Sequence, residues 1–207
     1  MRNPDAPSAR PIEFRSLDAK SDEALLKAIA GGSQAAMRAL YARHNLRVFR
    51  FVTRMLNDTV RAEDLVSEVF IEVWSQAGRF EGRSQVSTWI LSIARFKALS
   101  SLRRRGEVEL DETFAESIAD TADTPEQAVL EKDRSAQLRS CLAQMSREHR
   151  EVIDLVYYHE KSVEEVAEIT QLPKNTVKTR MFYARKRLGE LLSAHRDFDH
   201  LTAPQAA

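Results

Sequence analysis

The sequence has a single cysteine, no long apolar run and no excess of either charge. Cys141 has no second cysteine to pair with in the 207 residues, so no disulfide forms within the chain and a reducing, cytoplasmic location is expected. No apolar stretch approaches the roughly 20 residues that span a membrane, and Pro4, Pro7 and Pro11 are not typical of a signal peptide. We find no internal repeat and no convincing β-strand pattern. The main structural signal is therefore helical periodicity, and we expect an all-α fold.

The net charge of zero conceals an uneven distribution. Residues 1–105 carry 18 basic and 11 acidic residues (+7), residues 106–148 carry 4 and 11 (−7), and residues 149–207 carry 9 and 9. Basic surfaces on both sides of an acidic segment suggest two nucleic-acid contacts joined by a segment with another role.

The acidic segment also predicts the domain boundaries. Residues 106–126 contain eight acidic residues and no basic residue, and a segment that repels itself in this way is expected to be a flexible linker. We predict two small helical domains, the second with a helix-turn-helix. The predicted parts are a disordered tail at 1–19, an N-terminal domain at 20–105, the linker at 106–125, a C-terminal domain at 126–194 and a tail at 195–207.

Residues 162–188 have the pattern of two short helices separated by a sharp turn. In the first helix, Ser162 is a candidate N-cap and Glu165 completes a capping box. The turn spans 171–175 around Pro173, which cannot continue the first helix, and Asn175 or Thr176 is expected to cap the second.

The second helix of this pair is apolar on one side and basic on the other. The apolar stripe consists of Val177, Met181, Ala184 and Leu188, and no acidic residue lies between Lys174 and Arg187. Such a helix suits the major groove of DNA, although an ordinary helical hairpin with a solvated basic face is the alternative. The predicted DNA-contacting residues are Lys174, Asn175, Thr176, Lys178, Thr179, Arg180, Phe182, Tyr183, Arg185 and Lys186.

Four helices are predicted in the N-terminal domain. They span 22–30, 33–56, 62–76 and 86–105, with a loop at 77–85. Tyr41 and His44 fall on the buried stripe of the second helix, and Trp74 falls on that of the third. His44 is expected to be a packed side chain rather than a metal ligand, because no partner lies at a metal-binding spacing. In the C-terminal domain, helices are expected at 125–145 and around 152–156, with Cys141 as a buried structural thiol.

An acidic stripe runs along the 62–76 helix. Asp64, Glu68 and Glu72 are spaced four residues apart, where like charges repel each other. Because this repulsion destabilises the helix, the stripe suggests that a basic partner binds it. A solvated face and a pair of catalytic carboxylates are the alternatives, and the latter lacks a second type of charged group.

The loop at 77–85 and the helix after it combine aromatic and basic side chains. This combination is typical of single-stranded DNA binding, in which bases stack on rings and cations hold phosphates. The candidate residues are Phe80, Arg83, Ser84, Arg95, Phe96 and Lys97. The alternative is that these aromatics fill the core; we expect this of Trp89 and leave it open for Phe80 and Phe96.

Three motifs, in this order, resemble the extracytoplasmic-function sigma factors, a compact two-domain group of bacterial transcription initiation factors. They are A-E-D-L-V-S-E-V-F-I-E-V-W (62–74), F-E-G-R-S-Q-V-S-T-W-I-L-S-I-A-R (80–95) and V-E-E-V-A-E-I-T-Q-L-P-K-N-T-V-K-T-R (163–180). The resemblance extends over nearly everything from about residue 22 to residue 192.

The resemblance implies a role for each part of the chain. The 62–76 helix would dock on the clamp helices of the polymerase β′ subunit through Asp64, Leu65, Glu68, Phe70 and Glu72. The single-strand candidates would read the −10 promoter element by capturing a flipped base, and the helix-turn-helix would read the −35 element. The linker is similar to the segment that threads toward the polymerase active-site and RNA-exit channels. Expected partners are core RNA polymerase (β′ and β subunits), promoter DNA and an anti-sigma factor, with no cofactor, metal, catalytic residue or membrane insertion.

The chain departs from the family pattern at five positions. Phe96 stands where Asn is common and Ser100 where Asp is common, so the family's −10 base identity does not transfer. Tyr183 stands where Arg is common, so the −35 sequence does not transfer either. Ser67 and Asn175 replace the usual Gln and Gly.

Two other functions compete with this interpretation. A stand-alone helix-turn-helix regulator would bind duplex DNA as a dimer, but the chain has no dimerisation heptad and such a regulator needs no single-strand surface. An enzyme or metal site would rest on His195 and His200, which do not share a helix face well.

Overall fold

The computed structural model describes residues 20–104 and 137–202, with side chains as far as residue 194. Within these ranges the regular structure is helical and no β-strand occurs. The contacts divide the chain into two compact units: residues 1–53 with 59–101, and residues 54–58 with 102–207. The predicted linker at 106–125 and the tail at 1–19 lie outside the described residues.

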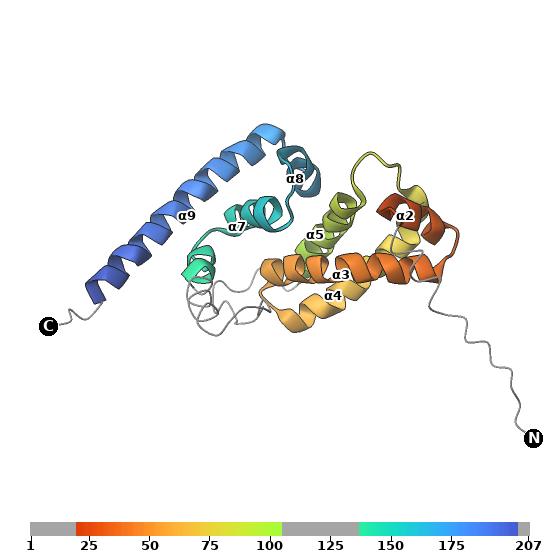
Figure 1. Cartoon of the computed structure of the whole chain (residues 1–207), viewed down its shortest axis with the longest axis horizontal. Helices are drawn as coiled ribbons and strands as arrows, with labels where there is room; N and C mark the ends of the chain where they lie inside the picture. The colour runs from red at the N-terminus through yellow and green to blue at the C-terminus, as the bar shows by residue number, and fades with distance from the viewer. Residues whose placement is uncertain (1–19, 105–136, 203–207) are drawn as a thin grey trace, which may run out of the picture. The chain divides into compact units, whose positions relative to one another are not determined.

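The N-terminal unit contains α2 (Asp22–Ala30), most of α3 (Gln34–Leu56), α4 (Thr59–Gln76), the short 3-10 turn η1 (Ala77–Arg79) and most of α5 (Val86–Arg104) (Figure 1). The turn at residues 57–58 joins α3 and α4 into a hairpin, and α2 packs against α4 and η1. Fully buried apolar side chains from every α-helix fill the core: Leu25, Leu40, Phe51, Val69, Val73 and Ile90.

Local hydrogen bonds and a glycine pair set the ends of the first helices. The hydroxyl of Ser21 accepts a hydrogen bond from the backbone N–H of Ala24 and caps α2, which ends at Gly31-Gly32. Gly32 has a φ of 86°, a left-handed conformation that glycine adopts without strain. The Ser33 hydroxyl caps α3 through the N–H of Ala36.

Two aromatic residues predicted for the core lie at its edge instead. Tyr41 is 41% exposed, and its ring meets that of Phe70 at a centroid distance of 4.8 Å in an edge-to-face contact. Trp74 is 39% exposed on α4. On α3, the small residues Ala36 and Ala39 are buried.

The prediction for His44 is confirmed. Its side chain is buried on α3, and its Nε2 lies 2.7 Å from Oδ2 of Asp22 on α2. The Arg43 guanidinium donates to the other oxygen of Asp22 at 2.6 Å. The hydrogen bond from His44, followed by that from Arg43, holds the pKa of Asp22 below its usual value of 3.8.

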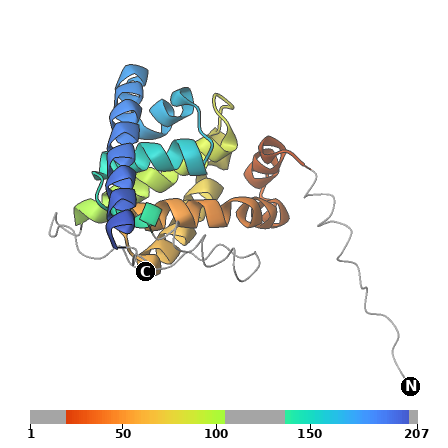
Figure 2. The same ribbon diagram turned by 60° about the vertical axis from the view of Figure 1, so that its left-hand side comes forward.

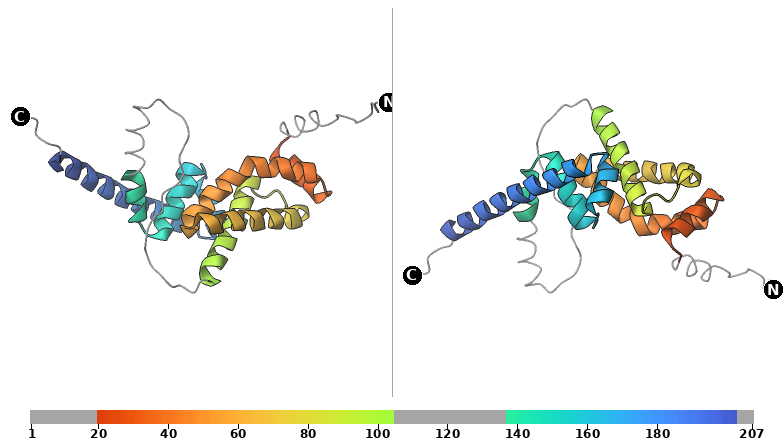
Figure 3. Two further views of the ribbon diagram at one scale, coloured as in Figure 1. Left: turned by 90° about the horizontal axis from the view of Figure 1, so that it is seen from below. Right: turned by 90° about the horizontal axis from the view of Figure 1, so that it is seen from above.

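The C-terminal unit consists of a helical segment at 137–143, α7 (Arg147–Ile153), a π-helical turn η2 (Asp154–Tyr158), α8 (Val163–Thr170) and α9 (Lys174–Thr202). Both α7 and α8 pack against α9, which runs past them as one long helix (Figures 2 and 3). The predicted tail at 195–207 is therefore wrong up to Thr202, because α9 continues through it. The side chains of His195 and His200 lie outside the described set.

Cys141 is buried, as the sequence predicts. Burial raises the pKa of its thiol above the usual value, which disfavours the reactive thiolate. The part of the predicted 125–145 helix before residue 137 lies outside the described residues.

Candidate nucleic-acid and polymerase interfaces

The turn between α8 and α9 is built by local hydrogen bonds. Ser162 and Glu165 form the predicted capping box at the start of α8, with N···O distances of 3.0 and 3.2 Å. At its end, Gln171 adopts a left-handed conformation with a φ of 55°. The N–H of Leu172 then bonds to the carbonyl of Ala167 at 3.1 Å, which closes the turn.

The second helix begins earlier than predicted. The carbonyl of Pro173 accepts the first helical bond from the N–H of Val177, so Pro173 occupies the N-cap position and α9 starts at Lys174. The fixed φ of proline is compatible with this place. Asn175 and Thr176 therefore lie inside the first turn of α9, and the prediction that one of them caps it is wrong.

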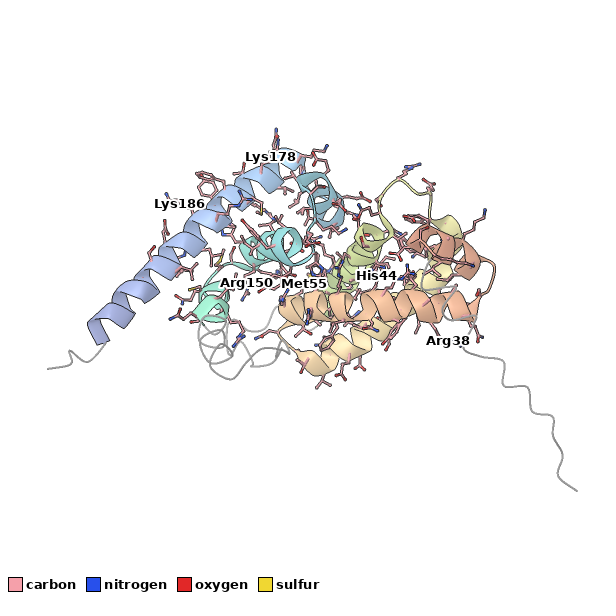
Figure 4. The ribbon with its side chains drawn as sticks, in the orientation of Figure 1. Arg38, His44, Met55, Arg150, Lys178 and Lys186 are labelled. Atoms are coloured by element: carbon pink, nitrogen blue, oxygen red, sulfur yellow. The ribbon has the colours of Figure 1, made fainter. Side chains whose placement is uncertain are left out.

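The buried and exposed sides of α9 match the predicted stripes. Val177, Met181 and Ala184 are buried, and Leu188 is half-buried. Five of the predicted DNA-contacting residues lie together on the exposed side of α9: Asn175, Lys178, Thr179, Phe182 and Lys186. We call these five residues the outward face of α9, and Figure 4 labels its two lysines.

The other predicted residues lie beside this face. Thr176 and Arg180 are half-buried. The pKa of Glu148 on α7 is held below 4.5 by its backbone hydrogen bond, then by Ser146, and then by the charges of Arg147 and Arg180. The Arg185 guanidinium lies 5.8 Å from the ring centre of Tyr157.

Lys174 links the two helices of the motif. Its Nζ lies 3.3 Å from Oε1 of Glu164 on α8. The backbone N–H of Glu164, followed by Lys174, holds the pKa of the Glu164 carboxyl below its usual value of 4.5. Tyr183 is exposed and flanks the outward face on the side away from Arg185.

On α4, the structure separates the predicted polymerase-binding residues into two groups. Leu65 and Phe70 are 4% exposed and pack in the core, so they support the helix and cannot form its contact surface. Asp64 and Glu68 are exposed and Glu72 is half-buried.

The exposed face of α4 also carries apolar residues that sequence reasoning missed. Val60 is 74% exposed and Ile71 is 69% exposed, and both share the helix face of Asp64. The sequence did contain a signal for this face: Val60 and Ile71 are eleven residues apart, which is about three helical turns, and Asp64 lies between them on the same side. We call Val60, Asp64, Glu68 and Ile71 the α4 surface.

The acidic stripe has a basic partner within the chain. Nζ of Lys97 on α5 lies 3.7 Å from Oε2 of Glu68 and 3.3 Å from Oε2 of Glu72. A hydrogen bond from Gln76, and then Lys97, holds the pKa of Glu72 below its usual 4.5. The assignment of Lys97 to phosphate binding stays a prediction, and in the structure its ammonium faces the carboxylates of α4.

Three aromatic residues lie on α5 or in the loop before it. The rings of Phe80 and Trp89 lie 5.3 Å apart at 53°, and Phe96, two helical turns after Trp89, is 66% exposed. Both Phe80 and Trp89 are half-buried, so the expectation that Trp89 is a core residue holds in part.

The loop before α5 turns at Gly82, whose φ is 70°. There the exposed Arg83 pairs with Glu81 at 2.6 Å, while Ser84 and Arg95 are half-buried.

No group of three or more His, Cys, Asp or Glu side chains in 20–104 and 137–194 is placed to hold a metal ion. Among the described helices, none combines the length and the apolar character that a membrane span requires.

Comparison with protein families gives two separate matches. The model of Sigma-70 region 2 matches residues 40–108, which include α4 and α5. The model of Sigma-70 region 4 matches residues 135–188, which include α7, α8 and the first half of α9.

Curated proteins and solved structures agree with these matches. The chain is 25% identical to the RNA polymerase sigma-H factor of Pseudomonas aeruginosa over 85% of this chain and 96% of that protein. It is 28% identical to the ECF RNA polymerase sigma factor SigK of Mycobacterium tuberculosis over 82% and 92%. Among structures, it is similar to CnrH in complex with the cytosolic domain of CnrY (25% identity, TM-score 0.62, 84% and 99% covered). It is also similar to RpoE in complex with the anti-sigma factor NepR from Bartonella quintana (25%, 0.60, 74% and 94%).

Proposed function

Because the chain belongs to the extracytoplasmic-function sigma factors of bacterial RNA polymerase, we propose that its two described units divide promoter recognition between them. The protein is an alternative sigma factor, which binds core RNA polymerase and directs it to promoters with −35 and −10 elements. It acts as a binding and strand-opening subunit, without chemistry of its own.

The outward face of α9 is the observation that carries the −35 assignment. A major groove admits one α-helix, and here the exposed side of that helix is polar and basic while the opposite side is buried. Lys178 and Lys186 supply phosphate contacts, whereas Asn175 and Thr179 are placed to reach base edges.

The aromatic surface of α5 supports the −10 assignment. Phe96 is the most exposed ring, so it is the first candidate to stack on an unpaired base. Phe80 already packs against Trp89, and we assign it the role of holding the loop that presents Arg83. Arg83 and Arg95 supply the phosphate contacts, and Ser84 lies between them in the chain.

The α4 surface is the proposed docking site for polymerase, with the β′ subunit as the partner. Two exposed apolar side chains beside two carboxylates suit a partner helix that is apolar in its centre and basic at its edge. Leu65 and Phe70 contribute by anchoring α4 in the core.

We further propose regulation by an anti-sigma factor in the cytoplasm. The solved relatives CnrH and RpoE are described in complexes with CnrY and with the anti-sigma factor NepR. A protein that covers the α4 surface or the outward face of α9 would block polymerase docking or promoter binding.

Reconstituted transcription tests the proposed function. Purified chain added to core RNA polymerase should produce run-off transcripts from a subset of genomic promoter fragments, and polymerase without it should not. The isolated chain should bind the same duplex weakly, because polymerase holds the two modules at the spacing that makes their binding cooperative. A tight, specific footprint of the free chain in physiological salt, with no transcription, would support the stand-alone regulator instead.

A further inference from the structure

Two large aromatic side chains project from α9 into solvent. Phe182 is 63% exposed and Tyr183 is 54% exposed, and their rings meet edge-to-face with centroids 5.4 Å apart. Most aromatic rings in soluble proteins are largely buried, so an exposed pair on a helix marks a candidate contact surface.

Thr179 adds an apolar group to the same surface. Its hydroxyl donates a hydrogen bond of 2.9 Å to the backbone carbonyl of Asn175, one turn earlier. The hydroxyl proton is used within the helix, and the side chain remains exposed. Because Thr179 lies three residues before Phe182, the two side chains are neighbours on α9.

The charge around these residues selects the partner. The fifteen positions 175–189 contain Lys178, Arg180, Arg185, Lys186 and Arg187 and no acidic residue. This positive charge favours a polyanion over an apolar protein surface as the partner of α9. Duplex DNA is the polyanion that this helix fits.

Only one base edge in the major groove has an apolar group. The edges of guanine, cytosine and adenine present hydrogen-bond donors and acceptors, whereas thymine also presents a C5-methyl group. A phenyl ring has no donor or acceptor and gains nothing from the other edges. The contact that matches Phe182 is therefore with thymine.

We propose that Phe182, Tyr183 and the methyl group of Thr179 form a reading surface for thymine methyl groups in the −35 element. The inference rests on the proposed function, which places α9 in the major groove, and adds the base that this chain selects. The ring of Tyr183 supports Phe182 by the edge-to-face contact and widens the apolar surface.

The test removes single methyl groups from DNA. Holoenzyme reconstituted from the full chain and core polymerase is bound to promoter duplexes in which each −35 thymine, on either strand, is replaced by deoxyuridine. Uracil pairs as thymine does and lacks only the C5-methyl group. We expect at least one position at which this replacement weakens closed-complex binding about fourfold, the effect of exposing one buried methyl group.

Variants connect that effect to the proposed residues. Phe182→Ala should bind the thymine promoter more weakly and should no longer distinguish thymine from uracil at that position. Tyr183→Phe should keep the discrimination, because the ring rather than the hydroxyl is needed, and Tyr183→Ala should reduce it. Both side chains are exposed, so unchanged thermal unfolding is the control for the fold.

Three outcomes would overturn the inference while leaving the proposed function intact. They are normal −35-dependent binding that is unaffected by every uracil replacement, an unchanged preference for thymine in Phe182→Ala, and a preferred −35 element without thymine on either strand. Loss of polymerase binding in Phe182→Ala would also overturn it and would assign the pair to a protein contact. Failure of the wild-type chain to form a holoenzyme would instead contradict the proposed function.

Discussion

The two helices proposed to meet DNA present their positive charge differently. Lys97 on α5 faces Glu68 and Glu72, and Arg83 in the preceding loop pairs with Glu81, so part of the charge of this region is compensated within the unit. On α9, Lys174 pairs with Glu164 and Arg187 with Glu190, whereas Lys178 and Lys186 are exposed on the outward face. The helix that keeps two lysines on its outward face is the one assigned to duplex DNA, and the helix that presents Phe96 next to the Arg83 loop is the one assigned to a single strand.

The difference has a physical consequence for promoter binding. Contacts to duplex phosphates release counterions, with a slope of about −0.9 in log K against log salt for each neutralised charge. Stacking of a base on a ring depends much less on salt. We therefore expect α9 to supply most of the salt-dependent affinity and α5 to supply most of the strand capture.

The largest expected effect comes from a charge placed on the buried side of α9. Ala184 is fully buried, and an uncompensated buried charge costs about 3–5 kcal/mol. Ala184→Glu should unfold the C-terminal unit and abolish the −35 footprint, while polymerase is still retained through α4. Circular dichroism and a pull-down of core polymerase measure the two results.

A substitution on the exposed side of the same helix is the matched control. A Cβ added at Gly189 meets nothing within 4 Å, so Gly189→Ala should stabilise α9 by about 0.5–1 kcal/mol and leave DNA binding unchanged. If Ala184→Glu kept a normal footprint, the assignment of the buried side would be wrong.

The next two substitutions distinguish phosphate contacts from base contacts on α9. Lys178→Ala should weaken holoenzyme binding to all −35 sequences and reduce the salt slope by about 0.9. Thr179→Ala should instead reduce discrimination between −35 sequences, by about 1–3 kcal/mol at most, with an unchanged slope. Fluorescence titration at several salt concentrations measures both, and equal slopes for the wild type and Lys178→Ala would contradict the phosphate contact.

On α5, the comparison predicts a loss of strand capture without a change in salt slope. Phe96→Ala should weaken binding of holoenzyme to a single-stranded −10 oligonucleotide by about 1–3 kcal/mol, the contribution of one stacked base. Phe80→Ala should also lower the thermal stability of the unit, because its ring packs against Trp89. If Phe96→Ala bound the oligonucleotide as the wild type does, the exposed ring would have no role in capture.

Lys97→Met tests the ion pairs between α5 and α4. Because the ammonium faces Glu68 and Glu72, its removal should leave the salt slope of DNA binding unchanged and should alter the affinity for core polymerase instead. Glu72→Gln is the reciprocal control. A reduced salt slope in Lys97→Met, with normal polymerase affinity, would support the phosphate-binding role.

The smallest effect is a pH dependence confined to the N-terminal unit. The pKa of Asp22 lies below 3.8 in the folded state, so the stabilising contact with His44 and Arg43 is fully present above about pH 4. It is lost as the pH falls through the lowered folded-state pKa. Asp22→Asn should reduce stability at pH 7 and flatten this part of the acid transition, as measured by thermal unfolding at each pH. An identical acid transition in the variant would show that Asp22 contributes nothing to it.

Local features of this chain could be predicted from the sequence. The capping box at Ser162, the glycine end of α2 and the apolar stripe of α9 depend on residues a few positions apart. Features that depend on packing between helices could not. The contact of Lys97 with the α4 carboxylates joins residues far apart in the chain, and the burial of Leu65 beside the exposure of Ile71 depends on how α4 is rotated against its neighbours.

Two errors near α9 have more specific physical reasons. Pro173 breaks the preceding helix, but its carbonyl also starts the next one, so the turn is shorter than its composition suggests. The acidic and basic residues after residue 194 resemble a solvated tail, yet α9 continues to Thr202.

The most direct test of the division between the two helices is to measure closed and open complexes in the same sample. DNase footprinting reports protection at −35, and permanganate reactivity of −10 thymines reports strand opening. With holoenzyme containing Phe96→Ala, we predict a normal −35 footprint and little permanganate reactivity. With Lys178→Ala at elevated salt, we predict loss of the footprint and of opening together. Normal opening in Phe96→Ala, or an unchanged footprint in Lys178→Ala under those conditions, would contradict the division of duplex and single-strand recognition between α9 and α5.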